Sequence, residues 1–273
     1  MNYSVEFKEA VDFSKENNLF LGYGNPKGKI LMIGKEQYYK SKEKPDSDEF
    51  YKDLKLKRNE VNSININSWL KNVENNFNPN WDLLKQTDEI NNNSQTIYWN
   101  QRNLQNRKLK SGEWNFGTSN TYLQYQKIYQ NVFNESNKQD KIDFQKEFFL
   151  TELNDLLAEK DFKFAKLREL KKDFISQRQK LFNLRFFKSF PIIVIASGHY
   201  SRDFDFNIEK SFEVEWTKET ILVGKSWINL HYSTNPENKR LLIHTRQLST
   251  SVANELIDEL SNIIKNFLQN LSK

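Results

Sequence analysis

Four side chains that can take part in acid–base chemistry each follow a short apolar run of the sequence. These are Glu36, Glu152, His199 and His244. An aromatic pair at residues 38–39 comes directly after Glu36 and its neighbour. A carboxylate beside an aromatic ring can activate water next to a stacked planar ligand. The ends of these apolar runs are therefore the first place to expect a functional site.

The apolar runs have the length and composition of buried strands. Such runs, separated by longer amphipathic segments, predict an α/β fold with a parallel sheet that is covered by helices on both faces. Ligands bind at the carboxyl ends of the strands in such sheets, so the four side chains are expected to converge on one cleft. The predicted strands are residues 30–33, 148–151, 191–196 and 240–243, and the predicted helices are residues 5–17, 121–133, 162–187 and 252–271.

The organisation of the chain is predicted from the segments between these elements. Residues 40–115 are polar and rich in Asn, with isolated tryptophans, and we interpret them as a long insertion with short helices that folds over the site. The Lys and Arg residues of the predicted helix at 162–187 are expected to form a solvated face, with contact to DNA as the alternative. No repeat or linker interrupts the pattern, so residues 1–273 are expected to form one domain.

The composition indicates a soluble protein with a lean core. Of the 273 residues, 37% are hydrophobic and 14% aromatic, so large rings are expected to fill much of the interior. The chain has no cysteine, which excludes disulfides and thiolate metal ligands. No apolar run reaches the length of a membrane span, so we expect a cytoplasmic protein. The net charge of +5 favours partners that carry phosphate, although 36 acidic residues are interspersed with 41 basic ones.

Two segments at predicted strand ends resemble the motifs of a known family. Residues 34–39 read Gly-Lys-Glu-Gln-Tyr-Tyr and are similar to the Gly-Gln-Asp-Pro-Tyr-His motif of the uracil-DNA glycosylase superfamily. Residues 244–249 read His-Thr-Arg-Gln-Leu-Ser and are similar to its last motif, His-Pro-Ser-Pro-Leu-Ser. The predicted strands at 148–151 and 191–196 resemble the two between these motifs. The resemblance implies a three-layer α/β/α fold with a central four-stranded parallel sheet, and the activity of a monofunctional DNA glycosylase.

The resemblance also implies a role for each matching residue. Glu36 would stabilise the cationic sugar and position water, and His244 would donate a hydrogen bond to the leaving base. The target base must leave the helix stack to reach the cleft. Tyr38 would screen the C5 position of the pyrimidine, Leu248 would fill the space that the base vacates, and Ser249 would contact a phosphate. The prolines of both motifs are replaced, so the geometry of the two loops differs from that of the family.

Other residues near the predicted strand ends complete the candidate site. Lys35 and Arg246 flank the proposed cleft and are expected to contact DNA phosphates. His199 either faces the cleft and binds the base or caps its own turn, whereas His231 is expected to have a structural role. The three histidines lack the spacing of metal ligands, so we expect no metal and no cofactor, with water as the nucleophile.

The identity of the base depends on which residue reads it. Glu152 occupies the position of the Asn that reads uracil in the family. An ionised Glu can only accept hydrogen bonds, so it suits the exocyclic amine of cytosine and repels O4 of uracil. A modified cytosine is then the favoured substrate, in anti-phage defence or in repair. An alternative alignment gives the reading role to Asn154 and restores specificity for uracil.

Two further functions stay open at the level of sequence. A non-catalytic member of the same fold could bind nucleic acid or a protein, and the lost prolines and the insertion would suit that role. A hydrolase of free nucleosides or nucleotides would not need a basic rim. We expect a monomer whose partner is DNA.

Overall fold

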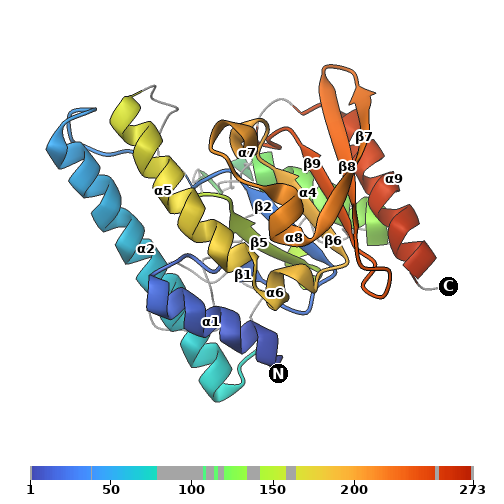
Figure 1. Ribbon diagram of the computed structural model, residues 1–273, viewed down its shortest axis with the longest axis horizontal. Helices are drawn as coiled ribbons and strands as arrows, with labels where there is room; N and C mark the ends of the chain where they lie inside the picture. Colours follow the sequence, from blue (N-terminus) through green and yellow to red (C-terminus); the bar gives the residue numbers. More distant parts are fainter. Residues whose placement is uncertain are drawn as a thin grey trace.

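A seven-stranded sheet with the strand order β1-β5-β2-β6-β9-β8-β7 forms the centre of the chain in the computed structural model (Figure 1). The structure describes residues 2–37, 39–78, 107–108, 114–115, 120–133, 142–157, 164–249 and 252–271. The strands of this sheet are β1 (Tyr23–Gly24), β2 (Ile30–Gly34), β5 (Phe148–Glu152), β6 (Ile192–Ala196), β7 (Val214–Val223), β8 (Ser226–Ser233) and β9 (Leu241–Thr245). The predicted α/β class is confirmed.

The sheet is wider than the four strands that the sequence predicts. Strands β5, β2, β6 and β9 are adjacent and parallel, and they coincide with the four apolar runs. Two additions extend them through antiparallel pairs: β1 pairs with β5, and the β7–β8 hairpin pairs with β9 through β8. Residues 227–232 were expected to form an extra strand or a loop and are part of β8. Strand β7 was missed because six consecutive residues of it are exposed, so the strand lacks an apolar run.

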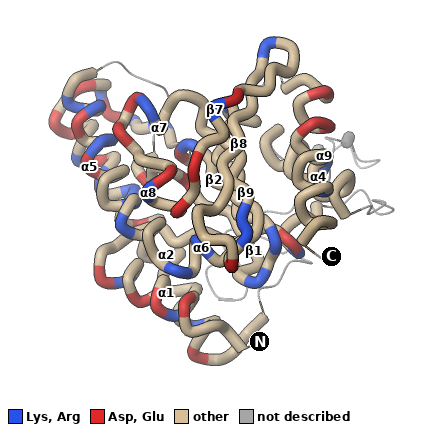
Figure 2. The backbone as a smooth tube through the Cα atoms, turned by 45° about the vertical axis from the view of Figure 1, so that its right-hand side comes forward, with Lys and Arg blue, Asp and Glu red and all other residues tan. Residues whose placement is uncertain are grey.

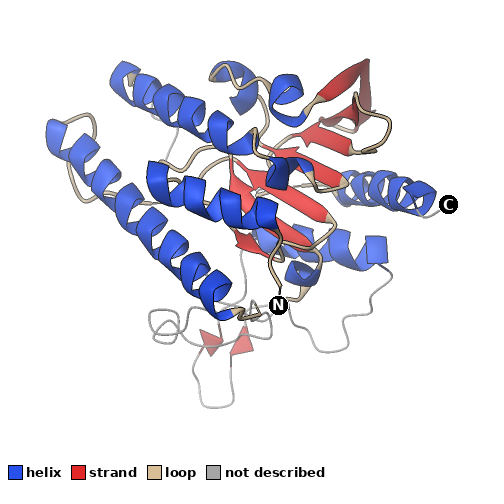
Figure 3. Cartoon of the chain, turned by 60° about the horizontal axis from the view of Figure 1, so that its bottom comes forward, coloured by secondary structure: helices blue, strands red, loops and turns tan. Residues whose placement is uncertain are grey.

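Helices lie on both faces of the sheet (Figures 1 and 3). Phe148 and Phe149 of β5 show why, because neighbouring side chains of a strand point to opposite faces. The Phe149 ring lies 6.2 Å from that of Phe7 on α1 and 5.2 Å from that of Phe186 on α6, whereas Phe148 lies 6.3 Å from Tyr129 on α4. The described helices are α1 (Val5–Asn17), α2 (Asp48–Asn75), α4 (Asn120–Phe133), α5 (Ala165–Phe182), α6 (Arg185–Lys188), α7 (Tyr200–Asp203), α8 (Ile208–Phe212) and α9 (Asn254–Leu271). A short 3₁₀ helix, η1 (Phe144–Lys146), and the pair β3 (Arg107–Lys108) and β4 (Trp114–Asn115) complete the described elements.

The expected insertion of short helices is wrong where the structure describes it. Helix α2 is a single helix of 28 residues, and it packs with α1 rather than over the predicted cleft. Its buried side is partly polar: Asn65 Oδ1 accepts from the backbone N–H of Leu21 at 2.9 Å, and Trp69 Nε1 donates to Gly22 O at 2.7 Å. Helix α2 therefore satisfies the backbone that leads into β1. Residues 79–106, 109–113 and 116–119 lie outside the described residues.

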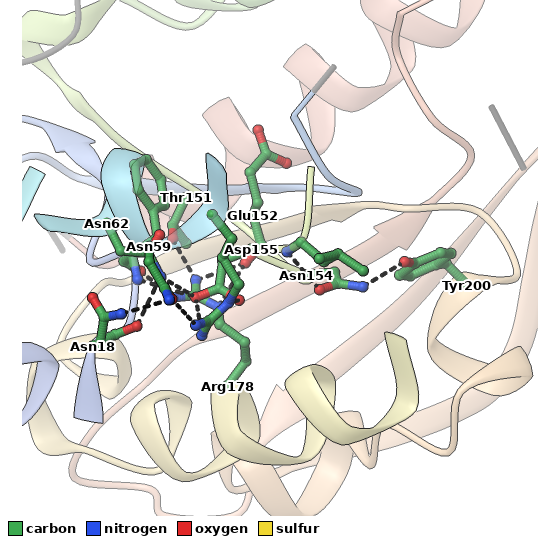
Figure 4. A network of polar contacts seen from close by, with 12 residues as sticks. Asn18, Asn59, Asn62, Thr151, Glu152, Asn154, Asp155, Arg178 and Tyr200 are labelled. Atoms are coloured by element: carbon green, nitrogen blue, oxygen red, sulfur yellow. Dashed lines mark hydrogen bonds and ion pairs between the residues drawn. The ribbon is translucent and has the colours of Figure 1, made fainter. Parts of the chain in front are cut away.

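A buried polar network joins α5 to the end of β5 (Figure 4). Arg178 of α5 is fully buried, and its guanidinium donates to Phe20 O, to Thr151 Oγ1 at 2.7 Å and to Glu152 O at 2.6 Å. Asp155 accepts from Arg58 of α2 at 2.8 Å in the same region. The segment at 162–187 is thus corrected in two respects. It ends as α5 and resumes as α6, and its basic residues are not all solvated.

Candidate active site at the carboxyl edge of the sheet

The carboxyl ends of the four parallel strands lie at one edge of the sheet. Gly34 at the end of β2 pairs with Glu152 of β5, and Ile195 of β6 pairs with His244 of β9. The segments that leave these strands therefore emerge side by side. This is the edge at which α/β sheets place their ligands.

A cavity of about 690 Å³ opens at this edge, and we refer to it as the edge cavity. Three of its lining side chains are cationic, and one other, Asp203, is a carboxylate. The Ser197 hydroxyl also lines it and has no hydrogen-bond partner within the described part of the chain. Cations and a hydroxyl donor that face one space suit an anionic ligand such as a phosphate. The lining includes Lys35, Arg168, Lys171, Ser197, His199, Tyr200, Asp203 and Gln247.

Glu36 is held in one orientation beside the edge cavity. Its Oε1 accepts from Lys171 Nζ at 2.9 Å, and its Oε2 accepts from the Tyr200 hydroxyl at 2.7 Å. Lys35 Nζ lies 3.9 Å from Oε1. The ammonium groups stabilise the negative charge, and the two hydrogen bonds fix the plane of the carboxylate. Lys171 of α5 is thus buried against the site, although a solvated face was predicted for the basic residues of this helix.

Asn154 lies behind Tyr200 and does not line the edge cavity. Its side chain is fully buried, and its Nδ2 donates to the Tyr200 hydroxyl at 2.9 Å. Its Oδ1 accepts from the Leu156 N–H at 2.9 Å. These bonds orient Tyr200 toward Glu36 and leave the amide oxygen engaged. The alternative prediction that Asn154 reads a base therefore finds no support in its position.

Glu152 points to the face of the sheet that α4 covers. Thr151, the residue before it, faces Arg178 on α5, and side chains alternate along a strand. Figure 4 shows the Glu152 carboxylate extending away from Arg178. On its own face the carboxylate interacts electrostatically with Tyr122 and Tyr125 of α4.

His244 faces the opposite side of the sheet from Glu152. It is in register with Ile195 and, through Ile33, with Thr151, so these side chains share the face of α5. The prediction that Glu152 converges with His244 on one cleft is therefore wrong. The two residues end strands at the same edge, but the sheet itself lies between their side chains.

Burial raises the pKa of the Glu152 carboxyl to about 8; the Arg178 guanidinium opposes this shift, and the charge of Glu36 adds to it. The carboxyl is therefore mostly protonated at neutral pH and can donate as well as accept. Gly34 makes room for it, because a Cβ at that position would lie 2.2 Å from Glu152 Oε2. The prediction that Glu152 selects cytosine assumed an ionised carboxylate, so a protonated Glu152 does not support it.

His244 is a neutral imidazole with a defined tautomer. Burial lowers its pKa to about 4, despite the hydrogen bond to Gly198. Its Nε2 lies 2.8 Å from Gly198 O, and a carbonyl oxygen can only accept, so Nε2 carries the hydrogen. Nδ1 is then the nitrogen that can accept. The predicted role as a donor to the leaving base requires Nε2–H to exchange its bond to Gly198.

A second cavity, of about 370 Å³, lies between α7 and the β7–β8 hairpin. The exposed His199 ring stacks on Trp227 at 5.4 Å and 17°, and it borders both cavities. Of the two predictions for His199, a position that faces open space therefore fits the structure. We call this space the hairpin cavity; its lining is His199, Arg202, Thr220, Trp227, Asn229 and His244.

The residues predicted to contact DNA are placed unevenly. Lys35 lines the edge cavity, and Arg246 and Ser249 are partly exposed after β9. Leu248 is only 1% exposed and belongs to the hydrophobic core, so it does not present the exposed apolar wedge that the resemblance implies. Tyr38 lies outside the described residues.

Acidic and basic residues alternate along several of the described helices. Figure 2 shows acidic and basic positions interspersed along the helices. Within the described ranges, no group of three or more His, Cys, Asp or Glu side chains could hold a metal ion. In the same ranges, no helix has the length and apolar content to cross a membrane.

Comparisons of the chain with protein-family models, with curated proteins and with solved structures find no match. The site must therefore be interpreted from its own geometry. Its main additions to the predicted set are Lys171, Tyr200, Trp227 and Asn229. Tyr200 stands at a predicted strand end, and Lys171, Ile175 and Arg178 share one helical face, which is a spacing that could have indicated burial.

Proposed function

We propose that the chain is a monofunctional DNA glycosylase that hydrolyses the N-glycosidic bond of a non-canonical pyrimidine, in repair or in anti-phage defence. The observation that carries the proposal is the placement of Glu36 after β2 and of His244 near the end of β9, on either side of β6. Glu36 is bonded to Lys171 and Tyr200, which line the cationic edge cavity, and His244 lines the adjoining hairpin cavity. The parallel order β5-β2-β6-β9, with helices on both faces, supports a three-layer fold like that of the uracil-DNA glycosylase superfamily.

Breaking an N-glycosidic bond builds positive charge on the sugar and negative charge on the base. A carboxylate whose orientation is already fixed stabilises the cation without reorganisation during the reaction. Glu36 has this property because Lys171 and Tyr200 hold both of its oxygens. The nearby ammonium of Lys171 weakens the effect, so a substrate phosphate that drew Lys171 toward the edge cavity would strengthen it.

In this proposal His244 stabilises the negative charge that develops on the leaving base. Its neutral ring can donate the Nε2 hydrogen to the leaving base once the 2.8 Å hydrogen bond from Nε2 to Gly198 O is broken. A neutral Glu152 no longer separates cytosine from uracil, so modified cytosine and uracil both stay in the proposal. Water is the nucleophile, and the mechanism uses no metal or cofactor.

A non-catalytic module of the same fold is the second candidate. The observation that favours it is that Glu36 and His244 are both engaged within the protein. The cations of the edge cavity would then bind nucleic acid without cleavage.

Oligonucleotides that carry uracil, hydroxymethylcytosine or glucosylated cytosine separate the two candidates. They are incubated with the protein and then treated with alkali, which breaks the strand at an abasic site. The enzyme predicts breaks that Glu36→Gln and His244→Ala abolish, while the exposed control Glu43→Gln retains them. Binding without breaks on every substrate would support the module instead.

A further inference from the structure

The hairpin cavity has the chemistry of a pocket for a planar heterocycle. Its volume of about 370 Å³ falls in the lower part of the range of small-ligand pockets, roughly 300–1,000 Å³. Trp227 contributes an aromatic surface: it stacks with His199, and it lies nearly perpendicular to the His244 ring, with 4.9 Å between the ring centroids. Stacking on aromatic rings is the sequence-tolerant part of nucleobase binding.

Polar groups stand next to one another on the floor of this cavity. Thr220 of β7, Asn229 of β8 and His244 of β9 are directly opposed in the strand registers, so they form a row across three strands. The Cβ atoms of opposed residues in antiparallel strands lie about 5 Å apart. Trp227 is two residues before Asn229 and shares its face of the strand.

The row offers a donor beside an acceptor. The Thr220 hydroxyl donates to Asn229 Oδ1 at 2.7 Å, so the oxygen is used and the Asn229 amide N–H groups are left to donate. Until the Nε2 hydrogen exchanges its bond for the leaving base, His244 gives that hydrogen to Gly198 O, and Nδ1 is the ring nitrogen that can accept. A nucleobase carries adjacent donors and acceptors on its Watson–Crick edge, and enzymes read a flipped base there.

We propose that the hairpin cavity is the base-reading pocket, where a nucleobase stacks against the His199–Trp227 pair and bonds Asn229 and His244. The phosphate of the same nucleotide lies in the edge cavity, which shares His199 as a wall. Asn229 and His244 thereby take the reading role that the resemblance implies for Glu152 or Asn154. The choice of a nucleobase rests on the proposed function, whereas the binding itself requires no cleavage.

Calorimetric titration tests the pocket with four probes: dUMP, dCMP, a single-stranded oligonucleotide that contains the same bases, and inorganic phosphate. The decisive variant is Asn229→Asp, which keeps an oxygen for Thr220 but replaces the amide donor with an acceptor. We expect it to weaken nucleotide or oligonucleotide binding roughly tenfold or more, and Trp227→Ala to weaken it as well. The control Asn238→Ala, at an exposed position that does not line the cavity, should leave affinity unchanged.

The titrations separate the possible ligand sources. Binding of dUMP or dCMP that Asn229→Asp weakens identifies a free nucleotide, and binding of the oligonucleotide alone with the same sensitivity identifies a nucleotide within a strand. Affinity that Asn229→Asp leaves intact overturns the pocket, and so does binding of inorganic phosphate alone or of no probe. Sensitive binding without base release would reject only the glycosylase, whereas base release with insensitive binding would reject only the pocket.

Discussion

Lys171 Nζ donates to Glu36 Oε1 across 2.9 Å, and their side chains are only 4% and 9% exposed. The contact links α5 to the segment that leaves β2, and it places a cation on the carboxylate that the proposed chemistry requires. A pair in this position affects both the stability of the fold and the strength of the charge at the site.

Replacing Lys171 with Met should destabilise the fold. The change leaves the Glu36 charge largely buried without its closest cation, and removal of one partner of a buried pair costs about 3–5 kcal/mol. We therefore expect the free energy of unfolding in urea to fall by about 3 kcal/mol. The double variant Lys171→Met with Glu36→Gln should recover part of that loss. Effects that add to within about 0.5 kcal/mol would show that the two groups are not coupled.

The pH dependence of stability should reveal the neutral Glu152. Its pKa is about 8 in the folded protein and near its ordinary 4.5 in the unfolded chain, so the folded state holds one more proton between these values. The contribution of Glu152 to the free energy of unfolding is therefore fully present below pH 4.5. It is lost as the pH rises toward 8, by at most about 1.4 kcal/mol per pH unit. Urea unfolding from pH 6.5 to 8 should show this fall in the wild type and not in Glu152→Gln. An equal loss of stability in the wild type and in Glu152→Gln over this pH range would contradict a raised pKa of Glu152.

His244 should contribute the opposite slope at lower pH. Its folded pKa is about 4, against an ordinary value of 6.5, so the unfolded chain holds the extra proton between these values. Its contribution to stability is present above pH 6.5 and is lost as the pH falls toward 4. Nitrogen NMR of the imidazole should show the Nε2–H tautomer unchanged from pH 8 to 5. A titration with its midpoint near 6.5 would show that the ring is not held as described.

Arg178 should be among the most sensitive positions of the core. Arg178→Met leaves the acceptors Phe20 O, Thr151 Oγ1 and Glu152 O without their buried donor. Each such loss costs about 1–3 kcal/mol, so the free energy of unfolding should fall by at least about 3 kcal/mol. Arg202→Met is the matched control, because that side chain is 72% exposed and should change stability by less than about 0.5 kcal/mol. Equal effects of the two changes would contradict the network.

The sequence predicts the parallel strands well because each is buried on both faces and reads as a continuous apolar run. Helix α2 could not be found in this way. Its buried stripe includes Asn62 and Asn65, which donate to backbone oxygens of distant segments, and Arg58, which pairs with Asp155. A hydrophobic period cannot detect a helix that is held by buried amides.

The sequence predicts at which edge of the sheet the site residues lie, but not on which face of the sheet each side chain lies. Thr151 and Glu152 are adjacent in sequence, and only the packing of α5 and α4 decides which of them meets Arg178. The β7–β8 hairpin had a usable signal. Gly224 has φ +58° and, with Lys225, forms a two-residue turn between β7 and β8.

Release of a free base in heavy-oxygen water tests the central claim most directly. The protein is incubated with a strand that carries one uracil or modified cytosine, and mass spectrometry follows the base and the strand. The proposed hydrolysis predicts a free base and an abasic strand that gains one heavy oxygen, abolished by Glu36→Gln and retained in Glu43→Gln. An intact strand with every substrate, or release that Glu36→Gln does not slow, would contradict the proposed function.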